Sequence, residues 1–206
     1  EVGGDLFDFF FLDDDYLCLA IGDVSGKGVP ASLFMAITRT LIKTRAVKSL
    51  PPHEIMYNVN NDLAIDNDSL MFVTLFLGIL KISTGEFSYS NGGHNLPYVI
   101  KNNGELVQIK KSKGMALGIM PRCQFDTNTI RLESGDKIYL FTDGVNEAMN
   151  KKLLPFSDDR LEKMLKKYHR ESPEKLITLS IEEIDTFAEG AEQSDDITIL
   201  TLEYLG

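Results

Sequence analysis

The stretch IGDVSGKGVP, residues 21–30, lies between two different periodic patterns. The run before it, 16–21, is apolar and aromatic, which predicts a β-strand. The stretch itself is rich in glycine, a residue that lets the backbone approach a ligand closely. Asp23 is therefore predicted to stand where a buried strand ends and a glycine-rich loop begins.

The residues after this stretch have the pattern of a helix. Pro30 suits the first helical turn, because the missing N–H of proline is not needed there. Leu33, Ile37 and Leu41 recur at four-residue spacing. This spacing predicts an amphipathic helix over 30–47, with these three side chains on one apolar stripe.

The rest of the chain alternates groups of strands with helices. Further strands are predicted at 6–11, 71–82, 86–90, 97–100, 106–109, 136–142 and 196–205, and further helices at 52–64, at 160–168 and between Pro173 and Gly190. Regular βαβ alternation is absent, and the turn signals join neighbouring strands as hairpins. This order favours an α+β layered sandwich over a doubly wound parallel sheet.

The composition fits one folded domain. The 206 residues are 43% apolar, 9% aromatic and 25% charged, which is enough for one sizeable core. The net charge of −10 argues against nucleic-acid binding, which needs a basic face. Cys18 and Cys123 lack the spacing of a zinc site. Because neither a signal peptide nor a membrane-length apolar run is seen, we expect a cytoplasmic protein without membrane insertion.

We expect a single domain over residues 1–206. No internal repeat, low-complexity stretch or linker interrupts the pattern. The chain starts at Glu1 and a Gly-Gly-Asp segment follows at once. We therefore expect this domain to be cut from a longer polypeptide, with a regulatory domain upstream.

Carboxylates stand at the edges of several predicted strands. They are Asp5, Asp23, Asp143 and the adjacent pair Asp195 and Asp196. Carboxylates that converge repel each other unless a cation neutralises them, and hard oxygen ligands select Mg²⁺ or Mn²⁺. A metal-dependent hydrolytic site is one interpretation. For each residue taken alone, an ordinary turn or capping aspartate is the other.

Lys27 and His94 are candidates for phosphate binding or catalysis. Lys27 lies in the glycine-rich loop, where a solvated lysine is the plainer interpretation. The loop departs from the NTP-binding phosphate loop, because three residues rather than four separate Gly22 from Gly26 and Gly28 takes the place of Ser or Thr. An NTP-hydrolysing switch is thus a weak alternative. His94 is either a catalytic group or a hydrogen-bonding structural histidine.

Taken in chain order, these segments resemble the metal-dependent type-2C protein phosphatases. The resemblance is to the bacterial branch of sporulation stage II protein E and the stress-response phosphatases that control sigma factors. The matching segments are VGGDLFD at 2–8, GDVSGKG at 22–28, NGGHN at 91–95, ALG at 116–118, FTDGVNEA at 141–148 and DDIT at 195–198. Each is weak alone, whereas the ordered set over nearly the whole chain is specific.

The resemblance implies a four-layer α-β-β-α sandwich with two central, mainly antiparallel sheets. It also implies two Mn²⁺ or Mg²⁺ ions at one end of the sheets. By resemblance, Asp23 bridges both ions, and Asp143 and Asp195 complete one of the two sites. The backbone carbonyl of Val24 serves the other site, with Asp5 contributing directly or through water.

The resemblance also implies a reaction and partners. A metal-bound water, held through Asp23, Asp143 and Asp195, attacks phosphoserine or phosphothreonine in line. The implied substrate is a phosphorylated protein, with STAS-type anti-sigma-factor antagonists as partners, and a homodimer is left open. The rival is a catalytically silent relative that serves as a sensor or protein-binding module. The presence of all the expected acids favours the enzyme.

Some roles stay unassigned within the resemblance. The family's metal-binding acid is the first of the two adjacent positions, so Asp196 is the less favoured ligand. Lys27 and His94 are candidates for substrate binding. The general acid has no candidate, because residues 24–25 are Val and Ser where eukaryotic relatives carry a histidine.

Overall fold

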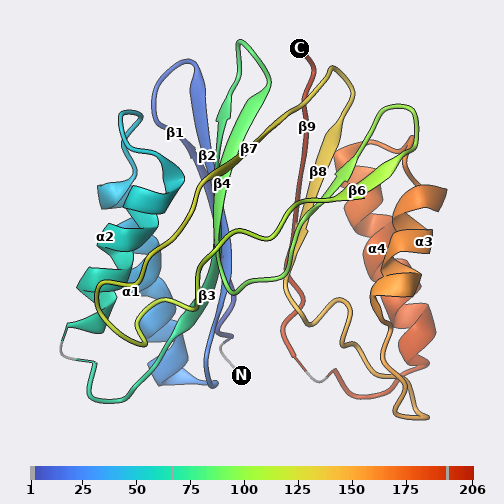
Figure 1. Cartoon of the computed structure of the whole chain (residues 1–206). Coiled ribbons are helices and arrows are strands. Elements are labelled where there is room, and N and C mark those ends of the chain that lie inside the picture. Colours follow the sequence, from blue (N-terminus) through green and yellow to red (C-terminus); the bar gives the residue numbers. More distant parts are fainter. Residues whose placement is uncertain (1–2, 66, 194) are drawn as a thin grey trace. The chain divides into compact units, whose positions relative to one another are not determined.

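The structure, a computed structural model, describes residues 3–65, 67–193 and 195–206. In these residues the chain forms nine strands and four helices. They divide into two compact units: unit 1 is Glu1–Leu96 with Lys110–Arg131, and unit 2 is Pro97–Ile109 with Leu132–Gly206. Each unit consists of one sheet and two helices (Figure 1). The single domain expected over the whole chain stays a prediction.

Unit 1 is built on a five-stranded sheet of order β1-β2-β3-β4-β7, with every pairing antiparallel. Its strands are β1 (Leu6–Phe11), β2 (Tyr16–Val24), β3 (Val73–Lys81), β4 (Glu86–Gly92) and β7 (Asn128–Arg131). Its helices are α1 (Val29–Arg45) and α2 (Pro52–Ala64), which pack against each other and against the sheet (Figure 1).

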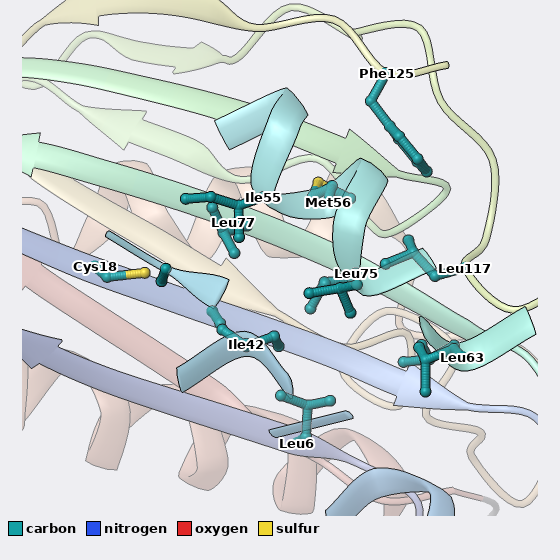
Figure 2. Close-up of a cluster of buried hydrophobic side chains, with 14 of the residues drawn as sticks. Leu6, Cys18, Ile42, Ile55, Met56, Leu63, Leu75, Leu77, Leu117 and Phe125 are labelled. Carbon is teal, nitrogen blue, oxygen red and sulfur yellow. The ribbon is translucent and has the colours of Figure 1, made fainter. Parts of the chain in front are cut away.

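The apolar core of unit 1 lies between this sheet and its two helices. Alternate side chains of a strand point to the same face, so one face of each strand supplies the core. The buried side chains in Figure 2 include Leu6, Cys18, Leu75 and Leu77 from the strands, Ile42 from α1, and Ile55, Met56 and Leu63 from α2. Removal of this apolar surface from water is the main force that holds the helices on the sheet.

Helix α1 forms where it was predicted, but it buries a different face. Leu33 and Ile37 of the predicted stripe are 61% and 54% exposed, whereas Ala31, Thr38 and Ile42 are buried. The Thr38 hydroxyl donates to a carbonyl of its own helix at 2.8 Å, so its burial leaves no unpaired donor. The predicted helix is confirmed, but of its apolar stripe only Leu41 packs against the core of unit 1, because periodicity groups residues by face and does not say which face meets the sheet.

Unit 2 has a four-stranded sheet of order β6-β5-β8-β9, again antiparallel throughout. Its strands are β5 (Tyr98–Ile100), β6 (Leu106–Gln108), β8 (Lys137–Phe141) and β9 (Ile199–Glu203). Its helices are α3 (Asp158–Lys167) and α4 (Pro173–Ala188), which share an apolar cluster with strands of this sheet. The hydroxyl of Ser172 accepts from the Lys175 backbone N–H at 3.3 Å, which confirms the predicted start of α4.

The predicted α+β class, with two mainly antiparallel sheets, is confirmed. The differences lie in the bounds of elements. β2 continues to Val24 rather than ending at residue 21, and the last strand begins at Ile199 rather than at 196. β7 was missed, because its four residues are at most partly buried and carry a weak apolar signal. No helix in the described part of the chain has the length and apolar character needed to cross a membrane.

Candidate metal centre

Asp23 lies inside a strand rather than in the loop that follows it. The extension of β2 to Val24 pairs Asp23 with Thr74 of β3, and the Asp23 residue is partly exposed. The residue that caps α1 is Gly28, and no side-chain hydrogen bond caps that helix. The alternative of a helix-capping aspartate is therefore wrong for Asp23.

The segment that carries Asp5 lies against the end of β2. A Cβ atom on Gly4 would be 3.0 Å from the Val24 carbonyl oxygen and 3.6 Å from Asp23 Oδ1. Asp5 follows Gly4 directly, and the next residue, Leu6, pairs with Gly22. Unit 1 thus brings the predicted ligand groups of Asp5, Asp23 and Val24 to one end of its sheet, with glycine at position 4 leaving room beside the carbonyl.

Hydrogen bonds from α1 and from the segment before β3 hold this strand end. The hydroxyl of Ser32 in α1 donates to the Gly3 carbonyl at 3.2 Å. The Ser25 N–H donates to the Phe72 carbonyl at 2.9 Å, and the Phe72 N–H donates to Ser25 Oγ at 3.0 Å. The residues on both sides of the predicted ligands are therefore tied to α1 and to the segment that leads into β3.

Unit 2 brings the other predicted acids to one end of its own sheet. Asp143 lies two residues beyond β8, and Thr142 and Thr198 continue the pairing of β8 with β9. The Thr142 N–H donates to the Thr198 carbonyl at 3.1 Å, and the Thr198 N–H donates to Thr142 Oγ1 at 3.0 Å. A Cβ atom on Gly144 would be 1.9 Å from the Asp196 carbonyl oxygen, so the two acidic segments are in backbone contact.

The adjacent pair differs in exposure. Asp195 is exposed, whereas Asp196 is partly buried. One carboxylate oxygen of Asp195 accepts from the Asp196 N–H at 2.9 Å. The choice of Asp195 as the ligand stays a prediction. Val2, the first residue of the quoted segment at 2–8, lies outside the described residues.

The two candidates for substrate binding lie in different environments. Lys27 is exposed and stands between Gly26 and Gly28, whose φ angles are +86° and +79°. His94 is only 6% exposed, and its Nδ1 lies 2.9 Å from Thr74 Oγ1. Sequence reasoning did not single out Thr74. Its place opposite Asp23 follows from strand register, which no local motif encodes.

A cysteine nucleophile finds no support in the structure. Burial raises the pKa of the Cys18 thiol to about 12, with a further contribution from the negative charge of Asp8. The thiol therefore stays protonated at neutral pH, and the thiolate is the reactive form. Cys123 is also buried.

The donors gathered at the two strand ends are carboxylate and carbonyl oxygens. This set fits Mg²⁺ or Mn²⁺, which prefer hard oxygen ligands. Gly4 and Gly144 support the fit, since a side chain at either position would displace the backbone beside a predicted ligand. Within the described residues no group of three or more His, Cys, Asp or Glu side chains forms a ready metal cluster. The full ligand set, with members in both units, stays a prediction.

The family model described as Stage II sporulation protein E (SpoIIE) matches residues 13–205. This chain belongs to the SpoIIE family. The resemblance expected from the ordered acidic segments is thereby confirmed. The SiaA PP2C domain of Pseudomonas aeruginosa, a solved structure, superposes with a TM-score of 0.87 at 22% identity. That superposition covers 98% of this chain and 81% of the other, so the fold is shared.

Two curated relatives of this SpoIIE-family chain come from bacteria. Protein IcfG of Synechocystis sp. is 30% identical, over 98% of this chain and 36% of its own length. Phosphoserine phosphatase RsbU of Bacillus subtilis is 29% identical, over 72% of this chain and 44% of its own length. The chain therefore spans less than half of the length of these relatives.

Proposed function

We propose that this chain is a metal-dependent protein serine/threonine phosphatase domain. The observation that carries the proposal is the end of β2, where Asp23, the Val24 carbonyl and the segment of Asp5 lie together. Membership of the SpoIIE family and the shared PP2C fold support it. The second acidic group, formed by Asp143 and Asp195, likewise offers carboxylate oxygens.

Each predicted ligand has a distinct role in the proposal. Asp23 would serve both of two divalent cations, Asp143 and Asp195 would hold one of them, and the Val24 carbonyl with Asp5 would hold the other. When bound, the two Mn²⁺ or Mg²⁺ ions neutralise charge on the phosphoryl oxygens and ready a water for in-line attack. Lys27, which is exposed in the adjoining loop, is proposed to contact the phosphate.

The proposed substrate is a phosphoserine or phosphothreonine in a protein. The relative RsbU is named a phosphoserine phosphatase, which supports this class. By the same resemblance we propose a STAS-type anti-sigma-factor antagonist as the partner. We also propose a regulatory domain upstream in the full protein and a cytoplasmic location.

Replacement of Asp23 tests this function. The Asp23→Asn variant keeps the shape of the side chain and removes its charge, so Mn²⁺-stimulated hydrolysis of p-nitrophenyl phosphate should fall at least ~100-fold. Asp13→Asn is the matched control, because it makes the same charge change at the β1–β2 turn. A phosphorylated STAS protein then replaces the small substrate. Unchanged turnover in Asp23→Asn would refute the proposal.

The same assay separates the rivals. A catalytically silent sensor or binding module would keep the fold and cleave neither substrate, whether or not Mn²⁺ is added. An NTP-hydrolysing switch would bind ATP or GTP and release phosphate from it. Calorimetric titration with each nucleotide, together with the phosphatase assay, distinguishes the three functions.

A further inference from the structure

We propose that His94 and Thr74 form a positioning pair that holds Asp23 in place for the metal, an inference that rests on the proposed phosphatase function. The pair adjoins the strand end that carries Asp23, with Thr74 directly opposite Asp23 on β3. Neither residue has to touch the substrate to act in this way. His94 is accordingly assigned a role different from the substrate binding expected from the sequence.

Thr74 connects His94 to the strand that carries Asp23. The antiparallel pairing of β2 and β3 puts Thr74 directly opposite Asp23. Thr74 Oγ1 lies 2.9 Å from His94 Nδ1 and donates to the Asp23 carbonyl over a longer distance of 3.4 Å. A hydroxyl has one proton, so when Thr74 donates to Asp23 it must accept the Nδ1 proton of His94. The three groups then form a directed chain that ends on the Asp23 backbone.

His94 is itself held in a fixed position. The Asn91 side chain donates to the His94 carbonyl at 2.8 Å and accepts from the His94 N–H at 2.7 Å. The Asn91 N–H in turn donates to Ser112 Oγ at 2.9 Å. His94, Asn91 and Ser112 are 6%, 3% and 5% exposed. A buried and mutually bonded set of polar groups has one arrangement, because any other would leave a buried group unpaired.

Burial decides between positioning and direct substrate contact. A phosphoprotein substrate meets exposed groups first, and the His94 side chain is almost wholly covered. Its Nδ1 contacts Thr74 and its backbone contacts the Asn91 side chain, both within unit 1. Removal of a group that hydrogen-bonds to a metal-ligating residue typically weakens metal binding 10–100-fold. The pair is therefore expected to act on metal affinity.

Matched substitutions test each member of the pair. Thr74→Val removes the hydroxyl and keeps the branched shape, whereas Thr74→Ser keeps the hydroxyl. His94→Leu removes the ring nitrogens, whereas His94→Asn puts an amide near the position of Nδ1. The measurements are the Mn²⁺ dissociation constant by calorimetry on the whole chain and the Michaelis constant for p-nitrophenyl phosphate at saturating Mn²⁺.

Loss of the hydrogen bond should weaken Mn²⁺ binding about tenfold in Thr74→Val and in His94→Leu. The two variants that keep the bond should stay within about threefold of the wild type. The Michaelis constant should not change in any of them. The double variant Thr74→Val/His94→Leu should bind Mn²⁺ no more weakly than the worse single variant, because the two residues act as one unit.

Ile79→Ala is the control for a general loss of stability. Ile79 is a buried core residue of the same strand, β3, and is five positions from Thr74. It should lower the melting temperature without changing Mn²⁺ affinity. If Thr74→Val and His94→Leu behave like Ile79→Ala, the positioning role is wrong. If His94→Leu raises the Michaelis constant and leaves Mn²⁺ affinity unchanged, His94 binds substrate directly and the positioning role is wrong.

Failure of the proposed function has a separate signature. A wild-type chain that shows no Mn²⁺ binding in the calorimeter refutes the metal site, and the positioning role with it. A wild-type chain that binds Mn²⁺ while all four single variants bind equally well refutes the positioning role alone.

Discussion

Gly144 lies directly against the backbone of Asp196, since a Cβ atom on residue 144 would be 1.9 Å from the Asp196 carbonyl oxygen. The turn after β8 and the segment before β9 therefore meet without an intervening side chain. Asp143 and Asp195, which are far apart in sequence, adjoin the two sides of this contact. The glycine that follows Asp143 is thus required by the neighbouring acidic segment.

Gly144→Ala should separate these two segments. The added methyl overlaps a backbone carbonyl, which cannot rotate away, so we expect about 1–3 kcal/mol of destabilisation. We also expect Mn²⁺ affinity to fall more than about tenfold, because the ligand positions shift. Urea unfolding and calorimetric Mn²⁺ titration measure the two effects.

Gly104→Ala is the matched control for this substitution. Gly104 has a φ of +89° in the β5–β6 turn, so alanine there should cost about 1–2 kcal/mol. This turn lies beyond Ile100, which pairs with Lys137 at the opposite end of β8 from Asp143. Mn²⁺ affinity should therefore be unchanged. A loss of Mn²⁺ binding in Gly104→Ala that equals the loss in Gly144→Ala would show that the effect is not local.

Asp8→Asn should destabilise unit 1. The Asp8 carboxylate is 8% exposed, and Oδ2 accepts from Arg39 Nε at 2.8 Å, with Lys43 Nζ at 3.3 Å. Hydrogen bonds between charged groups are among the stronger ones, and here the accepting carboxylate is buried. We therefore expect Asp8→Asn to lower the free energy of unfolding by about 1.5–3 kcal/mol.

Asp13→Asn provides the comparison on the same hairpin. Asp13 is more exposed and pairs with Lys48 at 2.8 Å on the surface, where solvent screens the ion pair. Its removal should leave the unfolding free energy nearly unchanged. Equal losses in the two variants, measured by urea unfolding, would contradict the assigned difference between a buried and an exposed carboxylate.

Asp136 should make stability depend on pH in the acid range. Burial acts to raise the pKa of Asp136, but the Lys101 ammonium at 2.7 Å and two backbone N–H donors outweigh it and hold the pKa below its ordinary value of 3.8. A lowered folded-state pKa means that folding favours the carboxylate. The stabilisation is therefore complete above the unfolded-state pKa and is lost as the pH falls through the folded-state pKa.

The comparison of wild type with Asp136→Asn measures this contribution. At pH 7 the variant should be less stable by about 1.5–3 kcal/mol, because charged hydrogen bonds are lost. Below pH 3.8 the difference should shrink as the wild-type carboxylate becomes protonated. Urea unfolding from pH 3 to 7 follows both curves. A difference that stays constant or grows on acidification would contradict the assigned direction.

The two faces of α1 should respond differently to truncation. Ile42 is fully buried, so Ile42→Ala should cost about 2–5 kcal/mol. Leu33→Ala and Ile37→Ala should each change stability by less than about 0.5 kcal/mol, because both side chains are mostly exposed. Thermal and urea unfolding of the three variants check the assignment. A large loss in Leu33→Ala would contradict this assignment of the two faces.

Local signals were enough for most of the secondary structure. Pro173 marked the predicted start of α4, and the turn signal between the strands predicted at 97–100 and 106–109 indicated the β5–β6 hairpin. Each signal depends on backbone preferences of a few adjacent residues, which survive in the folded protein. β7 lacked such a signal, because its side chains are at most partly buried.

The candidate ligands were predictable for a similar reason. An acid beside a glycine at the end of an apolar run is visible in the residue order, as at Asp23 and Asp143. The roles of Thr74 and Gly4 were not visible, because both depend on which strand lies opposite and in which register. The buried face of α1 was likewise set by the sheet against which the helix packs.

Residue patterns were therefore sufficient for the kind of elements, their order and the oxygen-rich chemistry of the site, because these follow from short-range preferences and from residue type. Tertiary structure was needed for the strand register that puts Thr74 opposite Asp23 and for the contact of Gly144 with Asp196. Such relationships join residues that are distant in sequence, and packing and hydrogen bonding select them only when the whole sheet forms.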